Sequence, residues 1–282
     1  MKKVIIIFLT IFSTAFTQVQ AQETATASAV IDGVYQKERL AQDIKETKRT
    51  LLGQLTEYDT LDKRYDISLA QFYNLKTLEA LQDAVELGKD TMFLRSQVLT
   101  TYLRLLELQL IEVEGAELSL KKEALARIER DKNDLALAQK QIKQIKDREQ
   151  LNQAADEFVI TGENIQQTAA FVNSLLSLSK LQTVYDQSEI LVKKIEDKVD
   201  NLESALLKAR QQSSIKEVKR LKDQTNQDLQ VLWLDLVKIN QDKHDREQYI
   251  NFNNGISSEI NDIYGQLSQL ITYLDEVLAN VK

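Results

Sequence analysis

The feature of this sequence that most constrains its fold is the absence of proline from all 282 residues. At the ordinary usage of about 5%, a chain of this length would contain roughly 14 prolines. Proline fixes φ and lacks an amide donor, so its absence removes the strongest interruption of helices and excludes polyproline linkers. Only seven glycines are present, which leaves few positions for tight β-turns. We therefore predict an all-α fold, an elongated antiparallel helical bundle or coiled coil with long helical hairpins.

The start of the chain has the pattern of a secretory signal peptide. Lys2 and Lys3 precede the apolar run Val4–Phe16, and Val19-Gln20-Ala21 fits a small-residue cleavage site. An uncleaved anchor is the alternative, but this run is shorter than the ~17–25 residues that a membrane-spanning helix needs. We predict that residues 1–21 are a signal peptide and that the chain is secreted, periplasmic or part of the cell envelope.

The composition restricts the classes of molecule that the chain is expected to bind. Removal of Lys2 and Lys3 would change the formal net charge from −7 to −9, which argues against nucleic acid and against docking on anionic lipid. With no cysteine and no proline, the chain has no lipobox and no LPxTG-type sorting motif. We expect protein partners, no nucleic acid, and no integral membrane segment after signal cleavage.

Hydrophobic periodicity predicts the organisation of the rest. Residues 22–33 are interpreted as a disordered lead, and residues 34–113 as a thicker bundle segment together with the C-terminal helices. Residues 114–210 are predicted to form a long coiled-coil hairpin with its tip near 158–163, and residues 211–282 the C-terminal helices. The expected helix interruptions are at Gly88, Gly162, Ser213-Ser214 and Gly255.

Two parts of this pattern stand out. A heptad seam in the first predicted helix is formed by Ile44, Leu51, Tyr58, Tyr65 and Phe72. The second predicted helix, Thr91–Glu157, is Leu-rich up to Val113 and strongly charged beyond it. We expect more than one neighbour to bury the Leu-rich part and one returning helix to cover the charged part.

The predicted hairpin tip is the first candidate site. Residues 158–179 contain a single charge, Glu163, directly after the most charged part of the chain. An apolar surface at the end of a charged stalk is typical of a docking site, although these residues could instead pack on one another and close the hairpin. The candidate partner-binding residues are Phe158, Val159, Ile160, Phe171 and Val172.

The second candidate is an apolar stripe with strict heptad spacing at the C-terminus. Such a stripe needs a partner helix, either within the chain or from a second copy, so self-association is one hypothesis. The stripe consists of Ile256, Ile260, Ile263, Leu267, Leu270, Leu274, Val277 and Val281.

Motifs for catalysis or metal binding are missing from the sequence. His244 is the only histidine, too few for a His₂ or His₃ metal site or a ferritin-like di-iron motif. Ser177–Lys180 and Ser213–Lys216 match Ser-x-x-Lys, but the accompanying Ser-Asp-Asn and Lys-Thr-Gly elements are absent. We predict no catalytic residue, no metal, no cofactor and no enzymatic activity.

The function that these features favour is an exported, non-enzymatic coiled-coil protein that acts as a structural spacer, scaffold or assembly factor. One alternative is an α-helical membrane-active or pore-forming protein that uses the low-charge segment 158–179. Another is a periplasmic adaptor or holdase-like chaperone, which the chain resembles in fold class only. An adhesin or a phage-related tail component also fits the pattern.

Overall fold

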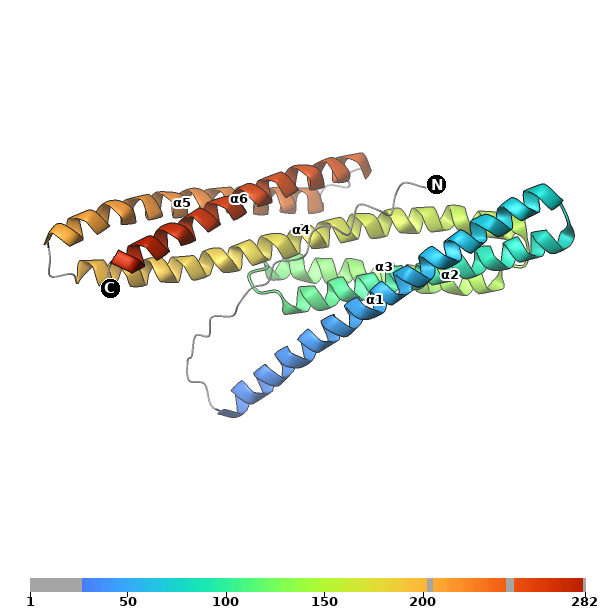
Figure 1. Cartoon of the computed structure of the whole chain (residues 1–282), viewed down its shortest axis with the longest axis horizontal. Helices are drawn as coiled ribbons and strands as arrows, with labels where there is room; N and C mark the ends of the chain where they lie inside the picture. The colour runs from blue at the N-terminus through green and yellow to red at the C-terminus, as the bar shows by residue number, and fades with distance from the viewer. Residues whose placement is uncertain (1–26, 202–204, 242–245, 281–282) are drawn as a thin grey trace. The chain divides into compact units, whose positions relative to one another are not determined.

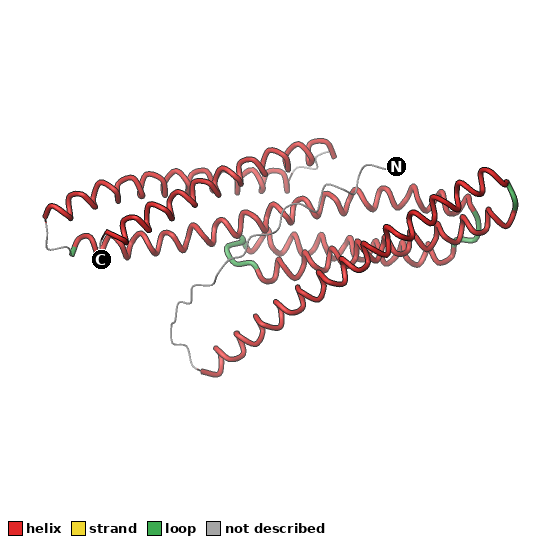
Figure 2. Tube along the Cα trace, in the orientation of Figure 1, coloured by secondary structure: helices red, strands yellow, loops and turns green. Residues whose placement is uncertain are grey.

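The computed structural model describes residues 27–201, 205–241 and 246–280, and the described residues fold into six helices without a strand (Figure 1, Figure 2). The prediction of an all-α fold is confirmed. The predicted signal peptide and residues 22–26 lie outside the described residues. The helices are α1 (Ala27–Leu75), α2 (Leu78–Glu112), α3 (Leu118–Gln144), α4 (Arg148–Asp200), α5 (Ala205–Gln241) and α6 (Arg246–Asn280).

The chain divides into two compact units, residues 1–39 and 40–282. The described part of the first unit, residues 27–39, belongs to α1. Residues 27–33 were predicted to be disordered and are helical instead; they contain no proline that would end the helix. All packing described below lies within residues 40–282.

Helix α4 is the element that α2, α3, α5 and α6 share. It packs against α2 and α3 and also against α5 and α6, and α5 and α6 pack against each other (Figure 1). We call α1 from Leu40, α2, α3 and the first part of α4 the N-terminal bundle. The last part of α4 with α5 and α6 is the C-terminal bundle. The C-terminal helices therefore pack on α4, not beside residues 34–113 as predicted.

The two bundles meet at adjacent residues of α4. The Thr183 hydroxyl lies 3.1 Å from the carbonyl oxygen of Glu114, in the α2–α3 loop. Its neighbour Gln182 accepts a hydrogen bond of 3.2 Å from the indole N–H of Trp233 on α5. One continuous core of buried apolar side chains, from Val85 to Val277, extends through both bundles.

Three breaks divide the chain between consecutive helices from α1 to α4, and none of these breaks is at a predicted position. The α1–α2 turn is at Lys76, which has a φ of 53°, and Thr77, whose side chain caps α2 by accepting from the amide of Ala80 (3.2 Å). Gly88, the predicted stop, is inside α2. A Cβ there would lie 2.7 Å from Cδ2 of Leu151 and 2.9 Å from Cε2 of Tyr65, so this glycine allows close packing of helices and does not end one.

The predicted helix Thr91–Glu157 is interrupted twice. At the α2–α3 loop, Gly115 has a φ of +81°, and a Cβ there would lie 2.7 Å from the Ser179 carbonyl oxygen. The α3–α4 turn follows at residues 145–147, where Asp147 caps α4 by accepting from the amide of Gln150 (2.9 Å). The Gln150 side chain in turn accepts from the amide of Lys146 (2.8 Å), an arrangement close to a capping box.

Because α4 begins at Arg148, residues 158–163 are in its interior and the predicted hairpin tip is wrong. The hairpin itself exists: α4 returns beside the charged helix α3, with its turn more than ten residues earlier than predicted. The interruptions expected at Ser213-Ser214 and Gly255 are also wrong, since α5 and α6 run through them. Capping and tertiary packing decide these boundaries, and an isolated glycine or serine pair does not.

Candidate functional site

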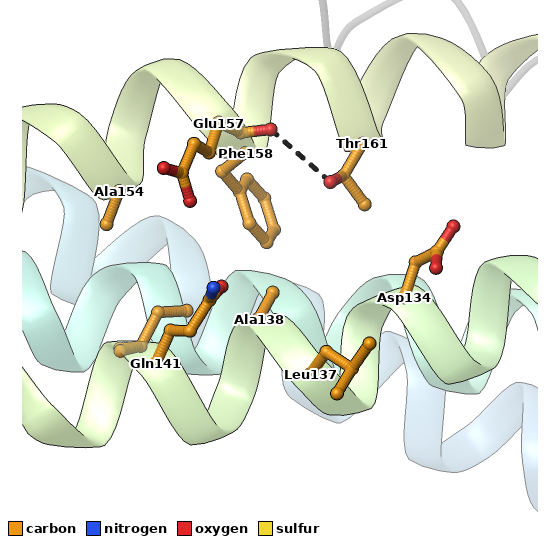
Figure 3. Close-up of a pocket in the computed structure, with 9 residues that line it drawn as sticks. Asp134, Leu137, Ala138, Gln141, Ala154, Glu157, Phe158 and Thr161 are labelled. Atoms are coloured by element: carbon orange, nitrogen blue, oxygen red, sulfur yellow. Dashed lines mark hydrogen bonds between the residues drawn. The ribbon is translucent and has the colours of Figure 1, made fainter.

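A groove of about 220 Å³ lies between α3 and α4 in the N-terminal bundle (Figure 3). Asp134 and Thr161 are at one end of it, Gln141 and Ala154 are at the other, and Phe158 projects from α4 toward Ala138 between them. The residues that line the groove are Asp134, Leu137, Ala138, Gln141, Ile142, Ala154, Glu157, Phe158 and Thr161.

Helical spacing and small side chains form this groove. On each helix the lining residues recur at three- and four-residue intervals, so they share one face. Ala138 and Ala154 contribute only a methyl group each, which leaves space above the floor. Phe158 on the floor is 4% exposed, and Arg95 of α2 lies over its ring, 5.4 Å from the centroid. The groove is therefore open to solvent above a fixed aromatic ring.

The polar groups of the groove are two carboxylates, one amide and one hydroxyl. The Thr161 hydroxyl donates to the carbonyl oxygen of Glu157 (3.3 Å), and Gln153 donates to Oε1 of the Glu157 side chain (3.1 Å). The lining residues include no cysteine, histidine, serine or lysine. Chemically, the groove can accept hydrogen bonds and contact an apolar group, but its lining has no nucleophile paired with a base.

One turn from Asp134 on α3, a third carboxyl group is buried. Asp131 is 7% exposed, and burial raises the pKa of its carboxyl group, while a hydrogen bond with Thr168 acts in the opposite direction. Its Oδ2 has no hydrogen-bond partner among the described residues. The sequence analysis missed this residue because its burial depends on the pairing of α3 with α4.

The predicted partner-binding residues do not form one surface. Phe171 and Val172 are buried in the core, with Arg127 over the Phe171 ring at 4.7 Å. Val159 and Ile160 are exposed on α4, and Phe158 alone lines the groove. The low charge of residues 158–179 is thus explained by burial of most of its large apolar side chains between α2, α3 and α4.

The predicted association stripe faces the interior of the chain. Ile260 is partly buried, Val281 lies outside the described residues, and the other six residues are buried against α4 and α5. The stripe was expected to pack against a helix of the same chain or of a second copy, and in the structure it packs against helices of the same chain.

An exposed apolar surface occurs instead at the α1–α2 turn. Leu75 and Leu78 on either side of this turn are exposed, as is Tyr73. Arg148, directly after the α3–α4 turn, donates to the Tyr73 hydroxyl (3.3 Å) and lies over the Phe72 ring, so both turns are at the same end of the bundle. The sequence Leu-Lys-Thr-Leu at 75–78 could have indicated this turn. Hydrophobic periodicity alone does not reveal it, because these residues also fit one continuous helix.

The chain matches no protein-family model, no curated protein and no solved structure. Within the helices that the structure describes, no stretch is both long and apolar enough to cross a membrane. Over the same residues, no three His, Cys, Asp or Glu side chains gather to hold a metal ion. His244 lies outside the described residues.

Proposed function

We propose that the chain is an exported, non-enzymatic protein that acts as a spacer, scaffold or assembly factor by binding another protein in the groove between α3 and α4. The groove itself is the observation that supports this function. Its volume of about 220 Å³ is below the ~300–1,000 Å³ typical of small-molecule pockets. It fits a side chain that projects from a partner's surface better than a free metabolite.

The architecture supports a spacer role. The 53 residues of α4 span on the order of 80 Å at ~1.5 Å per residue, and α4 belongs to both bundles. A partner bound beside α3 is thereby connected through a single helix to the α5–α6 end. The alternative of a membrane-active protein loses its main support, because segment 158–179 is largely used for packing inside the chain.

A periplasmic adaptor or holdase-like chaperone is a further alternative. A scaffold or adaptor binds one defined partner at one surface, whereas a holdase binds many unfolded chains over its exposed apolar positions. Crosslinking at single positions separates these two behaviours, because it reports which surface is contacted and how many products form.

The experiment places a photo-crosslinking amino acid at Leu137 on the groove rim or, as a matched control, at Leu234 on α5. These leucines are 58% and 60% exposed. In cells that express the chain, we expect one discrete crosslinked product from position 137, reduced by Asp134→Lys, and none of that mass from position 234. A smear from both positions would favour a holdase, and no product from position 137 would contradict the proposal.

A further inference from the structure

The exposed apolar surface at the α1–α2 turn is separate from the groove and has no role in the proposed function. Every residue from 73 to 79 is exposed, and we call this segment the apical turn. Leu78 is 70% exposed, Leu75 64% and Tyr73 55%. Residues 67–78 contain a single charge in a chain with 28% charged residues. The apical turn is therefore an apolar surface at the end of a helical hairpin.

The apical turn projects beyond the α3–α4 turn at the same end of the N-terminal bundle (Figure 1). Leu151 of α4 lies opposite Gly88 of α2. Seven residues further along each helix, Arg95 lies over the Phe158 ring, so α2 and α4 run in the same direction. Gly88 is ten residues after the start of α2, or about 15 Å at ~1.5 Å per residue. Arg148 is three residues before Leu151, which places it about 10 Å from the apical turn along the bundle.

The chemistry of this end changes with distance from the apical turn. Leu75 and Leu78 come first. Tyr73 follows, and its hydroxyl accepts a hydrogen bond of 3.3 Å from Arg148, whose guanidinium group lies 5.8 Å from the centroid of the Tyr73 ring. Lys146, in the adjacent turn, is exposed. Apolar side chains, then a tyrosine, then cations within about 10 Å match the order of acyl chains, interface and phosphates in a bilayer.

The charge balance of this end indicates which kind of bilayer fits it. The apical turn and residues 146–149 together contain three cations and three anions, so they have no excess positive charge that would attract anionic lipid. The whole chain has a net charge of −7, which an anionic membrane repels. Zwitterionic headgroups carry one charge of each sign and match this balance. The six residues are Lys76, Lys146, Arg148, Glu79, Asp147 and Glu149.

We propose that the apical turn docks on the surface of a zwitterionic lipid bilayer, with Leu75 and Leu78 at the level of the acyl chains. Tyr73 and Arg148 then lie at the headgroups. A stable protein interface uses ~20–30 residues a side, whereas the apical turn has seven, and a fluid bilayer adapts to a projecting surface. Insertion of two leucines gives weak, reversible docking, and it leaves the groove accessible to the protein partner.

The test measures binding of the chain, purified from cells that export it, to phosphatidylcholine vesicles by flotation at increasing lipid concentration. We expect the wild-type chain to float with the vesicles. Leu75→Ser and Leu78→Ser should each weaken the partition coefficient about tenfold, because each removes one inserted leucine. Leu118, 64% exposed at the start of α3, is the matched control, and Leu118→Ser should change the coefficient less than twofold. Circular dichroism verifies that each variant keeps its helix content.

A fluorescent label then reports which part of the chain enters the bilayer. The chain has no cysteine, so Asn74→Cys in the apical turn and Lys122→Cys on α3, both exposed positions, each take one environment-sensitive fluorophore. Vesicles should shift the emission to the blue at position 74 and leave it unchanged at position 122. Adding anionic lipid to the vesicles should weaken binding, and this loss should shrink as salt increases.

Three outcomes would overturn the inference. The first is that the wild-type chain does not float, or that all three serine variants lose binding equally. The second is binding that strengthens with the anionic lipid fraction, which would indicate a basic site. The third is a dimer in the absence of lipid that Leu78→Ser abolishes, which would assign the apical turn to a second copy. The apical turn is outside the groove, so the crosslink at position 137 tests the proposed function independently.

Discussion

The N-terminal and C-terminal bundles are both helical, but they are held together differently. In the N-terminal bundle, four phenylalanine rings each have a cationic side chain over them: the pairs are Phe72 with Arg148, Phe93 with Lys143, Phe158 with Arg95 and Phe171 with Arg127. Gly88 and Gly115 each allow a close approach that a Cβ would prevent. These contacts occur once each and do not repeat along a helix.

The C-terminal bundle depends on repetition. Its core is the heptad stripe of α6 packed against α4 and α5, and its helices are joined at the surface by polar pairs. Lys219 and Lys222 of α5 pair with Glu196 and Glu189 of α4, and Gln266 of α6 donates to Asp228 of α5 (2.8 Å). No cation lies over an aromatic ring among the described residues of this bundle.

The difference teaches which kind of packing a periodic sequence encodes. A repeated stripe specifies a helix face and requires only that some helix covers it. Contacts that occur once depend on where each turn falls, because the turn sets which residues of neighbouring helices are opposite each other.

The largest effect should come from truncating the heptad core. Leu270 is fully buried at the α4–α5–α6 interface, so Leu270→Ala should lower the free energy of unfolding by about 3 kcal/mol. Its neighbour Ile271 is 40% exposed, and Ile271→Ala should cost less than about 1 kcal/mol. Denaturant unfolding of both variants measures the contrast, and equal losses would contradict the placement of the stripe in the core.

The next effect is in the N-terminal bundle. Gly115→Ala would force a left-handed φ on alanine and place its Cβ 2.7 Å from a backbone oxygen of α4, at a cost of about 2–3 kcal/mol. Gly265 is inside α6 with nothing within 4 Å of an added Cβ, so Gly265→Ala should stabilise the chain by about 0.5–1 kcal/mol. The melting temperatures of the Gly115→Ala and Gly265→Ala variants measure this contrast. If both shift in the same direction, the backbone at Gly115 is not constrained as the structure shows.

The smallest effect concerns the buried Asp131. Because its pKa is raised in the folded chain, its contribution to stability is present at acid pH and is lost as the pH rises through the folded pKa. Asp131→Asn should therefore stabilise the chain at neutral pH, and the gain should shrink at about pH 3. The exposed Asp134→Asn is the control, with less than about 0.5 kcal/mol of change at either pH. A gain independent of pH would reject this explanation.

The sequence predicted the helix faces better than the helix ends. In the seam from Ile44 to Phe72, Ile44 packs with Leu105 and Leu108 of α2, and six of the eight residues of the α6 stripe are buried. Glycine was a poor marker of helix ends: Gly88, Gly162 and Gly255 are all inside helices, while Gly115 is in the loop. The better signals were side-chain caps, Thr77 and the Asp147-x-x-Gln150 pattern.

The groove could not be predicted from the sequence because the turn between its two helices was expected near residues 158–163. Its two walls are opposite each other only if the chain turns at residues 145–147, which brings Leu137 of α3 to the same groove as Thr161 of α4. A turn at 158–162 puts Thr161 in the turn itself and leaves Leu137 in the middle of a stalk. The cap at Asp147 decides between the two arrangements.

The measurement that tests this account most directly is therefore the distance between Leu137 and Thr161. The chain has no cysteine, so Leu137→Cys with Thr161→Cys gives two unique attachment sites for spin labels. Packed helices have axes about 8–10 Å apart, and we expect a label separation below about 20 Å. A single helix running on to residue 157 would separate residues 137 and 157 by about 30 Å. A label separation of about 30 Å or more would contradict the turn at 145–147, and with it the groove and its proposed partner.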